Sequence, residues 1–269
     1  MQGSYNYTKD NSELINEKSG ILPRCAEFIF EETNRLALHG RQFKIFFSAL
    51  EIYNENLFDL LGKFNKDNIM KKDKTSQITN MRQPLTIYSA NNDIQIKNLT
   101  WVAIENKEDI LRFTREASDS RRCDSTQFNS TSSRSHAIFQ IKIDSVKDDS
   151  SIESSIINII DLAGSERSSL QNLSAKTKEE IEAVKRIQNE ANFINKSLTT
   201  LGRIISMIGD KKSAKVAIPY RESKLTMVLQ NSLKPNSKTV MIVTVCSDVN
   251  NYNMTKESLK FATNAMISC

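Results

Sequence analysis

The string NSTSSRSH at residues 129–136 leads directly into two apolar segments, and this stretch decides the fold. In residues 137–143, apolar side chains alternate with polar ones, which predicts a half-buried strand. Residues 155–160 are almost wholly apolar and β-branched and end at Asp161. Such a run predicts a central strand that is covered on both faces. The chain therefore has a sheet at its centre.

Further strands and helices follow from the patterns on either side of this stretch. Residues 42–53 are rich in Phe and Ile and predict a buried strand, and residues 239–246 resemble the run at 155–160. Short strands are predicted at 85–88 and 93–96. Helices are predicted at 23–38, 107–118, 225–233 and 256–267, the first of them closing on Gly40. Strands mixed with helices in one continuous chain predict a layered α/β domain.

The longest pattern is helical, with apolar residues every three or four positions from Ile181 to Ile208. Thr177 and Glu180 have the spacing of a capping box at its start, and Gly209 can end it. The opposite stripe is polar and basic. This helix should therefore have one face for the core and one for water or a partner.

Composition excludes several classes of protein. The 269 residues are 39% hydrophobic and 26% charged with a net charge of +5, an ordinary soluble balance with a slight preference for an acidic partner. The 4 cysteines form no CxxC pair, so neither a zinc site nor a disulfide framework is indicated and a reduced cytosolic compartment is expected. No membrane span, secretory signal or nucleic-acid-binding pattern is evident.

The string DLAGSE at residues 161–166 has the chemistry of a phosphate site. A carboxylate at the carboxyl end of a strand lies where α/β sheets bind ligands. In nucleoside triphosphatases an Asp there holds magnesium, and the N–H of a following Gly can meet the terminal phosphate. Taken alone, however, the pattern DxxG is short, and an ordinary turn after a strand explains it better.

The string NSTSSRSH offers an amide, several hydroxyls and one guanidinium within eight residues. These groups could bind phosphate oxygens and orient a water molecule. A Ser/Thr turn that caps the following strand is the safer interpretation of this string alone.

Together the two strings resemble the two nucleotide switches of the kinesin motor domain. Further matches follow in the family's order: LEIYNE at 50–55, DLL at 59–61, INKSLTTLG at 194–202, IPYRESKLT at 218–226 and SLKFA at 258–262. The resemblance covers essentially the whole chain. It implies a P-loop NTPase-like α/β motor fold, with a central, mostly parallel or mixed sheet and helices on both faces.

The resemblance also implies roles for the residues of the two switches, with switch I at 129–136 and switch II at 161–166. Asn129, Ser132 and Ser133 would contact the terminal phosphate of ATP, Mg²⁺ and the lytic water. Ser133 would bind Mg²⁺ directly and Asp161 through water, while Gly164 would donate its N–H to the phosphate.

Arg134 and Glu166 would form the ion pair that closes the two switches around ATP. An Arg fork meets a carboxylate only when both loops close, so the pair is suited to report phosphate occupancy. The alternative is an ordinary surface ion pair of little energetic value.

The tubulin-binding region would span about residues 178–232, with Lys196, Arg203, Arg221 and Lys224 as cationic contacts. Because the surface of tubulin is acidic, such a patch would speed association and make binding sensitive to salt. The complete protein would be a dimer through a coiled coil outside this sequence. It would work in the cytoplasm on the microtubule cytoskeleton, including the spindle.

Three departures from the family stand out. The sequence contains no GxxxxGK[ST] phosphate loop, and its opening, MQG, resembles the end of that loop, so we expect a fragment truncated after the P-loop that lacks the first strands. Residues 168–189 exceed the family's loop by about ten residues and predict an N-terminal extension of the tubulin-facing helix. The chain ends at Cys269 without a neck linker, as in the C-terminal-motor, minus-end-directed class.

The preferred hypothesis is a microtubule-based motor that couples ATP binding and hydrolysis to microtubule binding and movement. The alternative is a non-catalytic microtubule-binding module with motor homology, favoured by the missing phosphate loop. A small GTPase or myosin relative would share DxxG but not IPYRESKLT or INKSLTTLG. An in-frame GxxxxGK[ST] upstream of Met1 would favour the motor.

The missing phosphate loop leads to a prediction for residues 1–269 alone. The strand of that loop would lie beside residues 155–160 and 239–246, so its loss leaves costly unpaired backbone and no cradle for the phosphates. We predict that this chain alone neither hydrolyses ATP nor folds as a fully stable unit. Isothermal titration with MgATP should show no micromolar binding, and a micromolar dissociation constant would contradict the prediction.

Overall fold

The structure is a computed structural model that describes residues 1, 17–64, 84–90, 93–123, 134–146, 151–164, 178–209 and 216–266. The strands are β1 (Gln42–Tyr53), β2 (Asn56–Asp59), β3 (Thr86–Ala90), β4 (Asp93–Lys97), β5 (Val102–Ile104), β6 (His136–Val146) and β7 (Ile152–Asp161). The α-helices are α1 (Ile21–Ala37), α3 (Lys107–Cys123), α4 (Lys178–Gly209), α5 (Lys224–Leu229) and α6 (Tyr252–Met266). Short 3₁₀ turns lie at Gly62–Phe64, Tyr220–Glu222, Gln230–Leu233 and Val249–Asn251.

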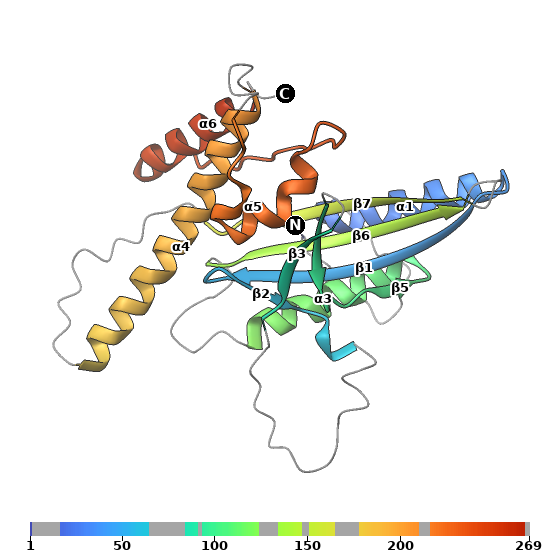
Figure 1. Cartoon of the computed structure of the whole chain (residues 1–269), viewed down its shortest axis with the longest axis horizontal. Helices are drawn as coiled ribbons and strands as arrows, with labels where there is room; N and C mark the ends of the chain where they lie inside the picture. Colours follow the sequence, from blue (N-terminus) through green and yellow to red (C-terminus); the bar gives the residue numbers. More distant parts are fainter. Residues whose placement is uncertain are drawn as a thin grey trace, which may run out of the picture.

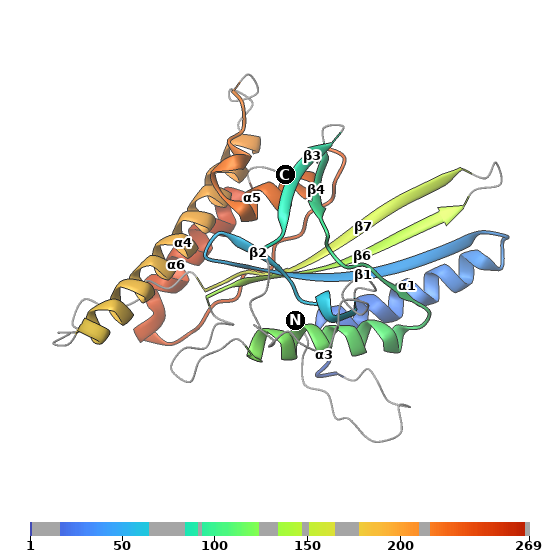
Figure 2. The ribbon, with the colours of Figure 1, turned by 60° about the horizontal axis from the view of Figure 1, so that its bottom comes forward.

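The main sheet has the order β2-β1-β6-β7, with β5 pairing to β1, and β3 and β4 form a separate hairpin. Figure 1 shows that β1 and β7 end, and β6 begins, at the end of the sheet beside α4. Figure 2 shows α1 and α3 together on one side of the sheet and α5 with the β3–β4 hairpin on the other. The predicted α/β architecture with helices on both faces is confirmed.

The direction of the strands corrects one expectation. A mostly parallel or mixed sheet was expected, but every pair among the described strands is antiparallel. Short connections explain the direction of the β1–β2 and β6–β7 pairs, because a parallel neighbour needs a crossover of a dozen or more residues. The connection from Val146 to Ile152 is too short for such a crossover, and a tight turn with Asn54 and Glu55 at positive φ joins β1 to β2.

Each face of the sheet has its own hydrophobic core, because alternate residues of a strand point to opposite faces. Phe47, Ala49 and Phe139 pack with α1 and α3 in one cluster. Leu50, Ile52 and Ile138 pack with α4 and α5 in the other. Strand β1 is thus covered on both faces over its second half, which makes it the centre of the described fold.

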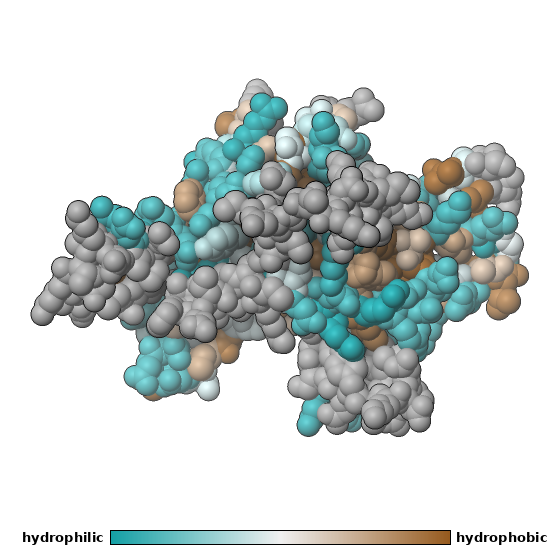
Figure 3. Space-filling model, turned by 90° about the horizontal axis from the view of Figure 1, so that it is seen from below, coloured by the Kyte–Doolittle hydropathy of each residue, from teal (hydrophilic) through white to brown (hydrophobic). Residues whose placement is uncertain are grey.

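Strand β7 differs from the central, fully covered strand that the sequence predicted at 155–160. Among the described strands it pairs only with β6, and Ile156 and Ile157 are 52% and 36% exposed. Ile152, the first residue of β7, is 69% exposed. Seen from below, the surface shows apolar areas among the hydrophilic ones (Figure 3). The apolar run does form a strand, but no described residue pairs with its outer edge.

The predicted strand at 239–246 is not formed. The segment is extended without ladder bonds, and Val240 and Ile242 are 86% and 69% exposed. Its composition favours a strand, but a strand requires a partner and no described strand supplies one. Among the described residues, no strand pairs with the outer edge of β7 or with residues 239–246.

The other predicted elements are confirmed with small changes in length. The strand at 42–53 has the predicted bounds, and the long helix begins at Lys178, so part of the expected N-terminal extension is helical. The helix predicted at 225–233 becomes α5 followed by a 3₁₀ turn. The capping Thr177 lies outside the described residues.

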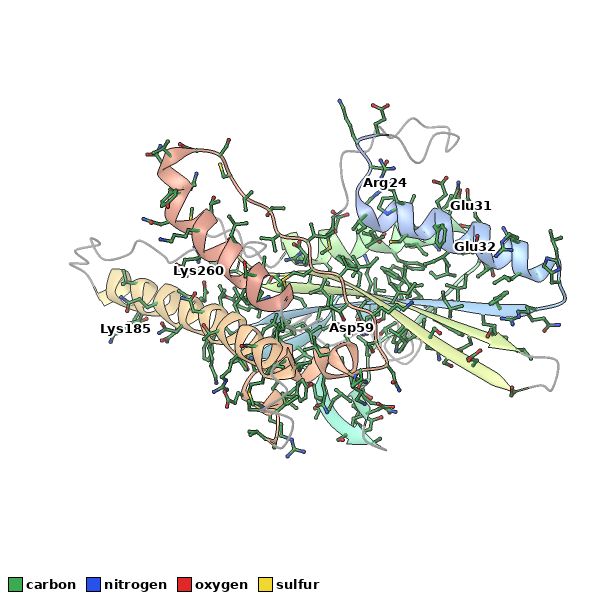
Figure 4. All side chains as sticks on the ribbon, turned by 90° about the horizontal axis from the view of Figure 1, so that it is seen from above. Arg24, Glu31, Glu32, Asp59, Lys185 and Lys260 are labelled. Atoms are coloured by element: carbon green, nitrogen blue, oxygen red, sulfur yellow. The ribbon has the colours of Figure 1, made fainter. Side chains whose placement is uncertain are left out.

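Asp59, the first residue of DLL, ties β2 to two loops. One carboxylate oxygen accepts the N–H of Leu61 at 2.8 Å, and the other accepts the N–H of Thr100 at 2.9 Å. Figure 4 shows this side chain in the middle of the molecule.

In the described part of the chain, no helix is long and apolar enough to cross a membrane.

The two-sided packing of β1 leads to a test of stability. Phe47 is fully buried and stacks on Phe139 at a centroid distance of 6.4 Å, whereas its neighbour Phe46 is only half-buried. Phe47→Ala should lower the free energy of unfolding by about 3 to 5 kcal/mol. The control Phe46→Ala should cost about 1 to 2 kcal/mol. Urea unfolding measures both, and equal losses would contradict the assigned core.

Candidate functional site

The two switch-like strings meet because β6 and β7 form an antiparallel pair. In the register of this pair, Ala137 lies opposite Asp161. The end of NSTSSRSH therefore lies beside the start of DLAGSE. Both lie at the end of the sheet that faces α4 (Figure 1). The candidate site is built on this end.

Asp161 is the last residue of β7, and its side chain is 52% exposed. Its carboxylate forms a long ion pair of 3.9 Å with the guanidinium of Arg121, and the exposed part of the side chain is accessible to water. Gly164 follows in a half-buried turn. Among the described residues no group of three or more His, Cys, Asp or Glu could hold a metal ion. A single accessible carboxylate suits Mg²⁺, which keeps several waters and takes further ligands from phosphates.

A buried polar group lies directly behind Asp161, and the sequence did not reveal it. Arg121 at the end of α3 donates to Glu51 of β1 at 3.3 Å and to the hydroxyl of Ser135 at 3.1 Å. Ser135 itself donates to Glu51 at 2.5 Å. The ion pair is buried, with 10% and 6% of the two side chains exposed. Removing either Arg121 or Glu51 would leave the other as a buried, uncompensated charge. The hydrogen bonds of this group connect α3, β1 and the residue before β6.

Arg134 contacts α4 in this structure. Its guanidinium donates to one oxygen of Glu190 at 2.8 Å, and the other oxygen accepts the hydroxyl of Tyr53 at 2.5 Å. Burial, followed by the hydrogen bond and the charge of Glu190, raises the pKa of Tyr53 to about 12, so the phenol stays protonated as a donor. Glu190 therefore joins the ends of two strands to the helix.

The partner that sequence analysis assigned to Arg134 was Glu166, which lies outside the described residues, as do Asn129, Ser132 and Ser133. The predicted roles of these four residues remain predictions. Of the predicted nucleotide-site residues, Arg134, Asp161 and Gly164 are described. The β6–β7 register puts them at the same end of the sheet.

His136 is the second link to α4. One ring nitrogen, Nδ1, accepts the N–H of Ala163 at 3.0 Å, and the other, Nε2, lies 2.9 Å from the hydroxyl of Ser197. Burial, and then the positive charge of Arg121, lower the pKa of His136 to about 4. The ring is therefore neutral at physiological pH.

The predicted cationic contacts lie on α4 and around α5. Lys196, Arg203 and Arg221 are exposed, and Lys224 is half-buried. Arg203 forms an ion pair with Glu222, which compensates part of its charge. Lys185 adds a further exposed cation on α4 (Figure 4). Among the described residues no carboxylate pairs with Lys196, Arg221 or Lys224.

Glu55, in the LEIYNE string, positions the start of α5. Its carboxylate accepts the N–H of Lys224 at 2.9 Å and the hydroxyl of Ser223 at 3.3 Å. Ser223 in turn caps the helix by accepting the N–H of Leu225. A carboxylate at a helix N-terminus is stabilising, so LEIYNE serves both the buried polar group and the cationic face.

Comparison with known proteins gives a consistent result. The family model of the kinesin motor domain matches residues 1–267. The chain is 36% identical to kinesin-like protein KIN-4C of Oryza sativa subsp. japonica over 261 residues, which are 91% of this chain and 19% of that protein. It is 34% identical to kinesin-like protein KAR3 of Saccharomyces cerevisiae over 250 residues, which are 93% of this chain and 32% of that protein.

Comparison with solved structures also finds kinesin motor domains. The motor domain of KAR3 from Saccharomyces cerevisiae superposes with a TM-score of 0.71 at 31% identity, covering 95% of this chain and 70% of that chain. A Kar3Vik1 C-terminal motor and motor homology domain fused to a synthetic heterodimeric coiled coil gives a TM-score of 0.72 at 31% identity, covering 95% and 60%. The chain thus spans only part of the length of the proteins it matches.

The lowered pKa of His136 leads to a prediction about acid stability. Folding favours the neutral ring, so its contribution is complete above the unfolded pKa of 6.5 and is lost as the pH falls toward about 4. We expect a loss of up to about 3 kcal/mol in the free energy of unfolding across this window. Chemical denaturation from pH 7 to pH 4 measures it.

The variant His136→Gln serves as the control, because it cannot take up this proton. Its stability should fall less steeply over the same range of pH. Parallel curves for the two proteins would contradict the assignment.

Proposed function

Because this chain belongs to the kinesin motor domain family, we propose that it works as part of a microtubule-based motor that couples ATP binding and hydrolysis to microtubule binding and movement. The observation that carries the proposal is the double link between the switch strings and α4. Arg134 reaches Glu190 and His136 reaches Ser197. A displacement of the two switch strings at the phosphate site would therefore shift α4, the helix that carries cationic residues such as Lys196.

The nucleotide part of the proposal rests on Asp161 and Gly164. Asp161 would hold Mg²⁺ through water, with Ser133 as a direct ligand, and the Gly164 N–H would meet the terminal phosphate. The metal would offset the charge of the phosphates. Asn129 and Ser132 would orient the attacking water, and Arg134 with Glu166 would close the site. In the complete protein this arrangement would make an ATP hydrolase.

The microtubule part rests on Lys196, Arg221 and Lys224, whose charges have no partner among the described residues. These cations would meet the acidic surface of tubulin. Arg203 would contribute less, because Glu222 already compensates it. We place the protein on the microtubule cytoskeleton, including the spindle.

For the complete protein we propose a dimer through a coiled coil. The Kar3Vik1 structure, which joins a motor and a motor homology domain through such a coil, supports this and the assignment to the C-terminal-motor class. The same structure also contains a motor homology domain, which supports the second candidate function. In that case the chain would be a non-catalytic microtubule-binding module. The outer edge of β7, with which no described strand pairs, favours that candidate for residues 1–269 alone.

Co-sedimentation with polymerised tubulin tests the proposal. The double charge reversal Arg221→Glu with Lys224→Glu should weaken binding about tenfold at low salt, because like charges would face each other across the interface. Added salt should weaken microtubule binding of the unaltered chain. The difference in affinity between the unaltered chain and the double variant should therefore become smaller.

The control is Arg41→Glu, an exposed charge before β1, at the far end of the sheet (Figure 1). It should leave microtubule binding unchanged. Equal losses in the control and the double variant, or no binding by the unaltered chain, would refute the proposed interface. ATP turnover by the complete protein then separates the motor from the non-catalytic module.

A further inference from the structure

His136 is only 3% exposed, and its ring joins two segments that are far apart in the chain. Ala163 precedes Gly164 in the switch II string, and Ser197 lies in the middle of α4. Each touches a different ring nitrogen, at 3.0 Å and 2.9 Å. The imidazole therefore connects the segment that follows β7 to α4.

The protons of this connection have only one consistent arrangement. A backbone N–H can only donate, so Nδ1 carries no proton and the neutral ring holds its proton on Nε2. Nε2–H then donates to the Ser197 oxygen. The Ser197 hydroxyl donates in turn to the carbonyl oxygen of Ile194 at 2.7 Å. All the bonds run in one direction, from Ala163 to the backbone of α4.

The contact face of α4 changes character along its length. Glu190 lies two helical turns before Ser197, so both side chains are on the same face. Both make directional polar contacts with residues at the start of β6, Arg134 just before it and His136 as its first residue. From Leu201 onward the same face is apolar and packs on the sheet. Apolar packing tolerates small shifts, whereas a hydrogen bond is weakened steeply by a change in angle.

We propose that His136 is a positioning residue that transmits displacements of the Ala163–Gly164 backbone to α4 through Ser197. The inference rests on the proposed function, because it assigns a role in coupling phosphate contact to microtubule contact. When Gly164 moves toward a phosphate, the N–H of Ala163 moves with it. The ring of His136 must move with this N–H, or the hydrogen bond between them breaks. Because the other side of the ring is bonded to Ser197, the movement reaches α4.

The competing explanation is a buried histidine that only fills space. A space-filling ring would need its volume but not its two specific partners. Deleting the Ser197 hydroxyl removes one partner and leaves the ring in place. The matched control is Thr200→Val, which removes a buried hydroxyl from α4 next to the contact face and keeps the shape of the side chain.

The experiment follows amide hydrogen exchange of Ala163 by NMR, with and without polymerised tubulin. In the free chain, Ser197→Ala should speed exchange at Ala163 about tenfold, because the ring is no longer held from the other side. Thr200→Val should leave exchange at Ala163 unchanged. Unchanged exchange in Ser197→Ala would overturn the proposal.

The second measurement tests transmission itself. In the unaltered chain, microtubule binding should change exchange at Ala163, and Ser197→Ala should bind microtubules but lose this change. His136→Asn gives an independent check, because its side-chain oxygen can accept from Ala163 but cannot reach Ser197. Without the contact to Ser197 it should leave exchange at Ala163 about as fast as in Ser197→Ala, and it should likewise lose the response to microtubules. A full response in either variant would overturn the proposal.

Failure of the proposed function gives a different result. If the unaltered chain does not bind microtubules, the proposed interface is wrong, and the free-chain exchange still decides whether Ser197 holds Ala163 through His136. The ¹⁵N shifts of the ring provide the same test without tubulin. They should show the proton on Nε2, and a proton on Nδ1 would exclude the link.

Discussion

The antiparallel register of β6 and β7 is the constraint on which the rest of the structure depends. Because Ala137 lies opposite Asp161, the end of one polar string is placed beside the start of the other. Buried residues on both strands, such as Phe139 and Ile159, fix this register. A slip of one residue would turn every side chain to the opposite face, and His136 would then point away from its present partners.

Much of this fold is predictable because its patterns are strong. The strand at 42–53 has a run of aromatic and β-branched residues, and α4 keeps a helical period over most of its length. The direction of the strands is less visible, since local patterning does not distinguish parallel from antiparallel neighbours. The segment 239–246 illustrates the same limit, because pairing depends on a second strand and not on composition.

The site was predictable in part. The motifs located Arg134, Asp161 and Gly164, but not the partners that orient them. Glu51, Arg121, Glu190 and Ser197 come from β1, α3 and α4, and only the folded chain brings them to β6. One signal was available: a charged residue, Glu51, inside the otherwise apolar second half of a strand requires a buried counter-charge. The sequence does not show where that counter-charge comes from.

The outer edge of β7 has a consequence for the behaviour of this chain at high concentration. Ile156 and Ile157 lie next to backbone groups that no described strand satisfies. Between Glu153 near its start and Asp161 at its end, this strand carries no charge and no proline, so its edge is a template for another copy of itself. Purified chains would then associate through this edge into pairs, in which the β7 of one copy lies beside the β7 of another.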